Sequence, residues 1–266
     1  MGSKNLFRYK KFDIVQEHAA MKVGTDSDLL GTLAAGGKDI LDIGTGTGII
    51  SLMMAQRFPE AKITAIDIDD NAILDATVNF ANSPFADRLT LQHISFQDYL
   101  EQFQVSSSKF QNSCGNALNP AFPECEHSEQ TLKLKPQYDC IVCNPPYFDK
   151  SQESDDLSRT RARHTSSLPF SVLIGGAYQL LKEGGVFSVC IPPEVLEEFS
   201  AECIFKGFWL QDKYKIKSIP EKEAKRFVLV HKKGSPSAPR IHTFCMRNSD
   251  KSRSEWYKEL MKEFHL

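Results

Sequence analysis

The tetrapeptide Asn144-Pro145-Pro146-Tyr147 carries the residue types best suited to chemistry in this 266-residue chain. The side chain of Asn144 offers an acceptor oxygen, the prolines stiffen the backbone and leave their carbonyls free, and Tyr147 offers a flat face. Together they would form an acceptor cup beside a stacking surface. Such a cup suits a planar, amine-bearing group such as a nucleobase or an amide, although the same residues also suit a plain strand-ending turn.

A buried strand is expected to position this tetrapeptide. The apolar stretch Tyr138–Cys143 leads directly into Asn144, which predicts that Asn144 lies at the carboxyl edge of a sheet, where open α/β sheets bind ligands. Cys140 and Cys143 in this stretch form a C-x-x-C pattern. An odd spacing on a strand points two side chains to opposite faces, so we predict buried thiols and no redox or metal pair.

A glycine-rich turn follows a second buried strand. Residues 38–43 run into Gly44-Thr45-Gly46-Thr47-Gly48, and residues 49–57 then have helical periodicity. Strand, glycine turn and helix in this order are typical of nucleotide binding, because glycines permit close approach and the helix N-terminus faces the ligand. The glycines are spaced G-x-G-x-G, whereas dinucleotide-binding folds have G-x-G-x-x-G. Asp42 at the strand end would repel a pyrophosphate but suits a cationic or amino-bearing ligand, which points away from NAD.

Two more strand ends would complete a nucleoside site. Residues 61–67 end in Asp67, whose carboxylate is placed to accept both hydroxyls of a ribose, and residues 69–71 are expected to cap a helix through Asn82. A third strand over 88–94 precedes Ser95 and Phe96. These two residues would reach the adenine of a bound nucleoside or form a plain strand-to-helix turn.

Two segments outside the strands carry cations beside this edge. Lys22 stands two residues before Gly24 and close in sequence to the carboxylates of Asp26 and Asp28. Thr25 or Asp26 is expected to cap a helix through Leu33. Arginines at every second position would line one side of an extended loop and could follow a phosphate backbone, although a solvated loop has the same pattern. That loop contains Arg159, Arg161, Arg163 and His164.

The composition restricts the class of protein. The formal net charge is −2, yet residues 60–105 carry eight acidic and two basic side chains, and residues 206–266 carry seven acidic and fifteen basic ones. An acidic middle and a basic C-terminal part would suit a small-molecule site in one region and a nucleic-acid-binding face in another. The same distribution also arises on an ordinary solvated surface. Seven cysteines without framework spacing indicate a reducing compartment without disulfides. No signal peptide or long apolar run is found, so we expect a soluble, cytoplasmic protein.

One large domain with appendages accounts for the remaining pattern. Residues 104–136 are rich in Ser and Asn and have no period, which predicts an inserted surface loop, and Cys114, Cys125 and His127 within it lack metal-ligand spacing. Helices are expected over 168–182, 194–206 and 255–264. Strands are expected over 186–191, 208–216, 227–231 and 241–246, the last three antiparallel.

The order of glycine turn, acidic strand end and Asn144–Tyr147 resembles the class I S-adenosylmethionine-dependent methyltransferases of the amino-methylating branch, over about residues 38–231. Residues 21–26 with Leu29-Leu30-Gly31 are similar to the bacterial tRNA adenine-N6 methyltransferases, which modify the adenosine beside the anticodon of a valine tRNA. The resemblance implies an α/β fold with a Rossmann-like open sheet of about seven strands whose last strands are antiparallel. It also implies that residues 1–35 close over cofactor and RNA, and that 36–266 form the methyltransferase domain.

The resemblance further implies site roles. The cofactor S-adenosylmethionine would be held at the glycine turn and Asp67, while Asn144 and the Pro145 carbonyl accept the hydrogens of the adenine amine and Tyr147 stacks the flipped base. That family usually has an Asp where Ser95 stands. The predicted catalytic residues are Asn144, Pro145, Pro146 and Tyr147; the predicted cofactor-binding residues are Lys22, Thr25, Asp42, Gly44, Thr45, Gly46, Gly48, Asp67, Ile68, Ser95, Phe96 and Asn144; and the predicted RNA-binding residues are Arg159, Arg161, Arg163 and His164.

Several alternatives remain open at the level of sequence. The same tetrapeptide would serve a protein glutamine-amide N-methyltransferase acting on a release factor or ribosomal protein, or a DNA adenine methyltransferase. A non-catalytic RNA-binding module is a further alternative. The expected partner is tRNA, and neither a membrane, a metal nor an obligate protein partner is indicated.

Overall fold

The computed structural model describes residues 5–108, 137–145 and 168–266. Some predicted features lie outside these residues: Pro146, Tyr147, Arg159, Arg161, Arg163, His164 and nearly all of the insert with Cys114, Cys125 and His127. Residues 104–108 belong to a helix, so the predicted insert begins later than expected.

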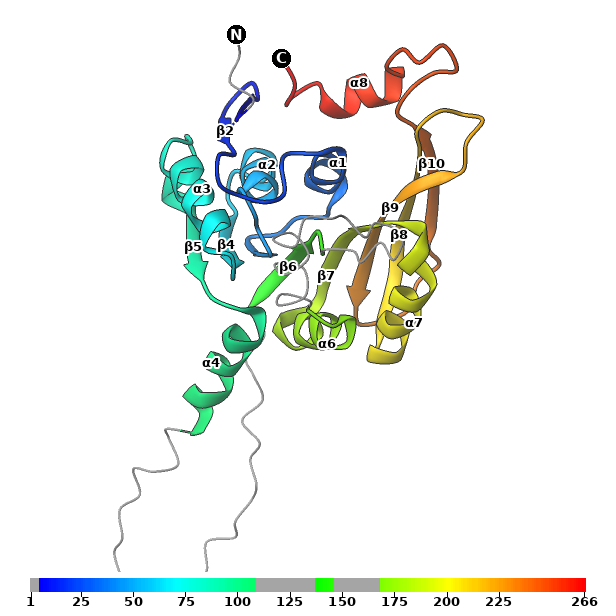
Figure 1. The fold of residues 1–266 in the computed structure, drawn as a ribbon. Coiled ribbons are helices and arrows are strands. Elements are labelled where there is room, and N and C mark those ends of the chain that lie inside the picture. The colour runs from blue at the N-terminus through cyan, green and yellow to red at the C-terminus, as the bar shows by residue number, and fades with distance from the viewer. Residues whose placement is uncertain (1–4, 109–136, 146–167) are drawn as a thin grey trace, which may run out of the picture.

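An eight-stranded sheet with the order β10-β8-β9-β7-β6-β3-β4-β5 forms the centre of the described fold (Figure 1). β9 runs antiparallel to both of its neighbours, and the other neighbouring strands of this sheet are parallel. The strands are β3 (Asp39–Ile43), β4 (Lys62–Asp67), β5 (Leu89–His93), β6 (Tyr138–Cys143), β7 (Leu181–Ile191), β8 (Phe208–Lys217), β9 (Ala224–Lys233) and β10 (Arg240–Cys245).

Helices cover both faces of this sheet, as an α/β fold with parallel strands requires. The first face carries α1 (Thr25–Leu33), α2 (Ile49–Arg57), α3 (Asp70–Ala81) and α8 (Glu255–Met261). The second carries α4 (Phe96–Ser108), α6 (Phe170–Leu180) and α7 (Leu196–Lys206). Short 3-10 turns, η1 (Ala86–Arg88) and η2 (Pro193–Val195), precede β5 and α7.

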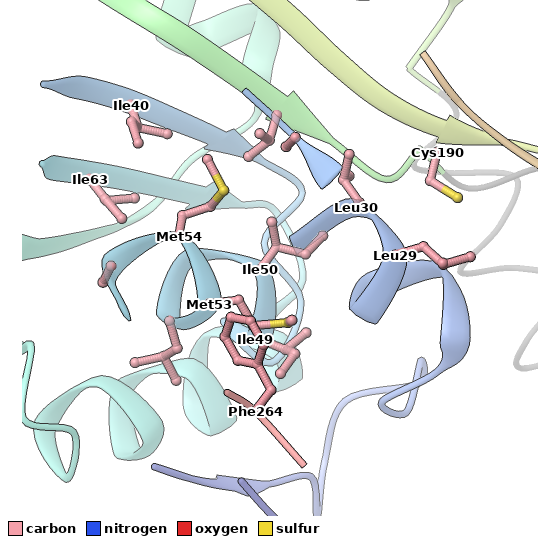
Figure 2. Packing of buried hydrophobic residues seen from close by; sticks show 14 of the residues in the cluster. Leu29, Leu30, Ile40, Ile49, Ile50, Met53, Met54, Ile63, Cys190 and Phe264 are labelled. Carbon is pink, nitrogen blue, oxygen red and sulfur yellow. The ribbon is translucent and has the colours of Figure 1, made fainter. Parts of the chain in front are cut away.

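The two faces have separate cores, and the cysteines of β6 mark them. Cys140 lies in the cluster with α1 and α2, whereas Cys143 lies in the cluster with α6 and α7. This confirms that the C-x-x-C thiols point to opposite faces. Burial raises the pKa of Cys140 to about 12 and that of Cys143 well above its ordinary value, so both stay protonated. Figure 2 shows side chains from α1, α2 and β3 in the first core.

The two ends of the described chain meet over the first face. β1 (Leu6–Arg8) and β2 (Asp13–Val15) form an antiparallel hairpin. Its Tyr9 bridges to His265, and the Tyr9 hydroxyl donates to the buried Asp28 carboxylate of α1 at 2.7 Å. The hairpin is therefore held against α1 and the C-terminal residues.

Several element boundaries differ from the expectation. α6 ends at Leu180 because Leu181 already pairs with Tyr138, so β7 begins five residues before the predicted strand. α1 begins after Gly24 with no side-chain cap, so the predicted capping by Thr25 or Asp26 is wrong. α8 ends at Met261, three residues before the predicted end.

β10 has a different partner from the expected one. The chain leaves β9 by a short turn, but the two edges of β9 are already occupied by β7 and β8. β10 therefore adds to the outer edge of β8 and pairs with it in parallel, Arg240 opposite Asp212. The expected antiparallel pairing holds for β8 with β9 and is wrong for β10.

Candidate functional site

Asn144 and Pro145 stand at the carboxyl end of the central strand β6. Cys143, the last residue of β6, lies level with Ile43 of β3 on one side and Val189 of β7 on the other. Asn144 is half-buried and Pro145 is buried. The predicted delivery of Asn144 to the carboxyl edge of the sheet is confirmed, and the glycine turn after β3 is its neighbour.

The glycine turn combines open space with one close contact. Gly44, Gly46 and Gly48 have φ values of 69°, 58° and 82°, a region that favours glycine. A Cβ on Gly44 or Gly46 would meet nothing within 4 Å, whereas one on Gly48 would lie 2.4 Å from Phe80. Gly44 and Gly46 thus border free space, and Gly48 is required by packing against the core.

Asp42 is fully buried beneath this turn. Its Oδ2 accepts hydrogen bonds from the hydroxyls of Thr45 and Ser51, both at 2.7 Å, but its Oδ1 has no hydrogen-bond partner. Burial raises the pKa of Asp42 to about 6, against the opposing effect of the two hydroxyls. An unpaired buried carboxylate oxygen is costly, and a cationic ligand would satisfy it. This agrees with the sequence prediction of an amino-bearing ligand.

Asp67 ends the neighbouring strand β4 and is tied to the glycine turn. Its Oδ2 accepts from the Gly46 amide at 2.8 Å, and its Oδ1 accepts from the Asp69 amide at 2.9 Å. Burial raises its pKa as well. Each oxygen retains acceptor capacity for a ribose hydroxyl. Ile68 follows with 51% of its surface exposed, which makes it an apolar group beside the carboxylate.

Asp69 begins the helix after β4. Its side chain accepts from the amides of Asn71 and Ala72, so it caps α3 as predicted. Its role at this edge is therefore structural.

The end of β5 differs from the predicted adenine contact. The Ser95 hydroxyl donates to Asp98 Oδ2 at 2.6 Å and accepts from the Asp98 amide at 3.0 Å, a reciprocal cap at the start of α4. Phe96 is 4% exposed and packs against Gly176 of α6. Phe96 therefore belongs to the core, and the exposed carboxylate here is Asp98. The S-x-x-D spacing was the signal that could have revealed this cap.

The segment carrying Lys22 and Thr25 folds back on itself before α1. The Lys22 ammonium donates to the Gln16 carbonyl, and Gln16 Oε1 accepts from the Val23 amide at 2.8 Å. Thr25 is half-buried at the first position of α1. Asp26 pairs with Arg226 of β9 at 2.6 Å, which ties this segment to the far half of the sheet.

Two buried side chains of α3 hold the N-terminal segment beside the glycine turn. Asn79 accepts from the Val15 amide at 2.7 Å and donates to the carbonyls of Val15 and Thr47, both at 2.8 Å. Asp75 accepts from the amides of His18 and Ala19 at 3.0 and 2.8 Å. Sequence reasoning missed both residues. Polar side chains four positions apart on an otherwise apolar helix face were the available signal.

These residues offer groups that suit a ligand with a cationic and a ribose-like part. Open space above Gly44 and Gly46, the unpaired Oδ1 of Asp42 and the acceptors of Asp67 fit the ammonium and ribose of S-adenosylmethionine. Within residues 5–108, 137–145 and 168–266, no three His, Cys, Asp or Glu side chains gather to hold a metal ion. In the same ranges no helix is both long and apolar enough to span a bilayer.

Comparisons with known proteins agree with this fold. Residues 35–226 match the family model described as Methyltransferase domain. The solved structure of Atu636 from Agrobacterium tumefaciens, described as a predicted O-methyltransferase, superposes with a TM-score of 0.60 over 90% of this chain and 96% of that chain at 18% identity. The chain is therefore a methyltransferase of this α/β class and depends on S-adenosylmethionine.

Full-length relatives define the family more narrowly. The tRNA1(Val) (adenine(37)-N6)-methyltransferase of Phocaeicola vulgatus is 38% identical over 98% of this chain and 97% of its own length. The protein of the same name from Trichodesmium erythraeum is 33% identical over 98% of both chains. The chain belongs to the tRNA1(Val) (adenine(37)-N6)-methyltransferase family.

Proposed function

We propose that this chain transfers the methyl group of S-adenosylmethionine to N6 of adenine 37 in tRNA1(Val). The observation that carries the proposal is the position of Asn144 at the end of β6, directly beside the glycine turn of β3. A methyl acceptor held at Asn144 and a cofactor held at Gly44, Gly46 and Asp67 would share one edge of the sheet.

Asn144 acts as a positioning and polarising group in this proposal. When bound, the cofactor supplies an electrophilic sulfonium methyl. The lone pair of the adenine amine is delocalised into the ring, so the amine is a poor nucleophile. The Asn144 oxygen and the Pro145 carbonyl would accept hydrogen bonds from its two N–H groups, which favours a more pyramidal nitrogen directed at the methyl. Formation of the N–CH3 bond would break the S–CH3 bond, so that S-adenosylhomocysteine leaves and the surplus N–H proton passes to water. An amide does not titrate near neutrality, so orientation and not general-base catalysis provides the rate gain.

The surrounding residues hold the two substrates. The Asp42 carboxylate would accept a hydrogen bond from the ammonium of the methionyl group, and the Asp67 carboxylate would accept hydrogen bonds from the ribose hydroxyls. Thr45 is bonded to Asp42 through its hydroxyl and acts through that carboxylate. Ile68 contacts the adenine of the cofactor, while Asp98 takes the place of the acid that Ser95 lacks. Tyr147 stacks the flipped adenine of the tRNA.

Two further segments complete the proposal. Residues 1–35 close over cofactor and RNA through Lys22 and Thr25, and the insert interrupts the domain formed by residues 36–266. The RNA backbone is contacted by Arg159, Arg161, Arg163 and His164. A tRNA substrate agrees with the cytoplasmic location expected from the sequence.

Transfer of labelled methyl to tRNA tests this function. Purified protein is incubated with methyl-labelled S-adenosylmethionine and either undermodified bacterial tRNA or a release factor. We expect label only with tRNA, released by ribonuclease and not by protease, and none with Asn144→Ala. Label in the release factor alone would contradict the proposal and favour glutamine-amide methylation.

A further inference from the structure

Three lysines lie on one face of β8, toward the edge formed by the carboxyl ends of the parallel strands, where Asn144 also lies. Lys213, Lys215 and Lys217 alternate along the strand, so their side chains leave the same face. We name them the lysine stripe. All three are half-buried, as expected of lysines, whose aliphatic stems can cover apolar surface while the charged group stays near water.

The pairing register places the lysine stripe relative to the catalytic strand. Lys213 is paired with Leu229 of β9, Leu229 with Val189 of β7, and Val189 with Cys143 of β6. Lys213 is thus level with the residue before Asn144. Three strand spacings separate them, on the order of 14 Å. β8 runs in the same direction as β6, so Lys215 and Lys217 extend from that level toward the edge where Asn144 stands.

The lysine stripe lacks anionic partners among the residues that the structure describes. No carboxylate there lies within ion-pair distance of the three ammonium groups. Burial and the neighbouring charge of Lys215 lower the pKa of Lys213, whose Nζ lies 5.2 Å from the centre of the Phe227 ring. The stripe is a concentration of like charge that a polyanion would relieve.

Glu221, in the turn between β8 and β9, is already engaged. The pKa of Glu221 is lowered first by the hydrogen bond from the Ser249 hydroxyl and also by the charge of Lys217. The Lys217 ammonium itself donates to the Pro220 carbonyl at 2.8 Å. Neither contact neutralises the stripe.

We propose that the lysine stripe binds the phosphate backbone of the substrate tRNA a few nucleotides away from the methylated adenine. Successive same-face residues of a strand are about 6.6 Å apart, so three ammonium groups can follow consecutive phosphates of one RNA strand. Lysine binds phosphate as a point charge without reading sequence. The stripe therefore contributes affinity and register, and the base is selected at the edge of β6. This inference rests on the proposed function.

Kinetics of a triple variant test the proposal. The variant combines Lys213→Gln, Lys215→Gln and Lys217→Gln in the full chain. Steady-state methyl transfer to transcribed tRNA is then measured. We expect the KM for tRNA to rise about tenfold with kcat and the calorimetric Kd for S-adenosylmethionine unchanged. The logarithmic slope of tRNA affinity against salt should lose about 0.7 for each phosphate contact removed.

Matched variants isolate position from net charge. Lys38, Lys62 and Lys206 are exposed near the opposite edge of the sheet, and their combined change to Gln removes the same charge. This control variant should have the same KM for tRNA and the same salt slope as the wild-type protein. Combined Lys→Arg changes in the stripe should also retain both values, and single Lys215→Gln and Lys217→Gln variants give partial effects if the triple variant is unstable.

The outcomes separate this proposal from the proposed function. An equal loss in the stripe and control variants, or an unchanged salt slope in the stripe variant, would overturn the lysine stripe while wild-type transfer to tRNA continues. Absence of wild-type transfer to any tRNA would instead overturn the function itself.

Discussion

Substituting Gly48 by alanine should damage folding, whereas the same change at Gly46 should damage cofactor binding. Both residues have positive φ, where alanine costs about 1–2 kcal/mol. At Gly48 the new Cβ would also lie 2.4 Å from the Phe80 ring, which is 6% exposed and has little room to move. Overpacking of this kind costs about 1–3 kcal/mol. The total for Gly48→Ala is therefore about 2–5 kcal/mol, a large part of the stability of a domain.

Urea unfolding and calorimetry separate the two effects. We expect Gly48→Ala to lower the unfolding midpoint strongly. Gly46→Ala should lower the free energy of unfolding by only about 1–2 kcal/mol, but should weaken S-adenosylmethionine binding, because its Cβ enters the open space beside the glycine turn.

The clash with Phe80 can be examined directly. In the double variant with Phe80→Leu, the cost of Gly48→Ala should shrink, giving a favourable coupling energy. Equal unfolding free energies for the two glycine variants, or no coupling with Phe80, would refute the assignment of Gly48 to packing.

Three more predictions concern buried or site residues. Asp42→Asn should bind S-adenosylmethionine more weakly by calorimetry, yet raise the apo-protein stability at pH 7.5, because the folded pKa of about 6 exceeds the ordinary 3.8 and the charged form costs on the order of 2–3 kcal/mol. Wild-type apo stability should fall as pH rises from about 4 to about 6 and then level off. Asn144→Ala should abolish methyl transfer while retaining cofactor affinity. Asn79→Asp loses both donated bonds of the amide, so the Kd for the cofactor should rise about tenfold or less.

Each of these predictions has a contradicting result. A lower stability of Asp42→Asn than wild type at pH 7.5 would show that Oδ1 has a partner. Turnover retained by Asn144→Ala would remove Asn144 from the mechanism. An Asn79→Asp protein with unchanged cofactor affinity and only a lower unfolding midpoint would restrict Asn79 to a structural role, and Asn79→Gln is the matched variant.

Local patterns predicted the strands and the turn at the centre of the candidate site. Strand, glycine turn and helix around Gly46, and the apolar strand before Asn144, are encoded by adjacent residues, so periodicity and turn chemistry were sufficient. The opposite faces of Cys140 and Cys143 followed from the two-residue period of a strand.

Features that depend on distant residues were not predicted. β10 pairs with β8 because β7 already occupies the edge of β9, a fact of sheet topology and not of composition. Phe96 packs on Gly176 of α6, eighty residues later. The docking of Val15 on Asn79 joins residues far apart in sequence. Only the assembled fold brings such pairs together.

Nucleoside mass spectrometry of tRNA provides the most direct test of the central claim. Undermodified tRNA1(Val) is incubated with the wild-type protein and S-adenosylmethionine, and ribonuclease fragments are analysed for the modified base and its position. We expect N6-methyladenosine at position 37, and none with Asn144→Ala. A methyl group on another atom or position, or unmodified tRNA beside a methylated protein, would contradict the account.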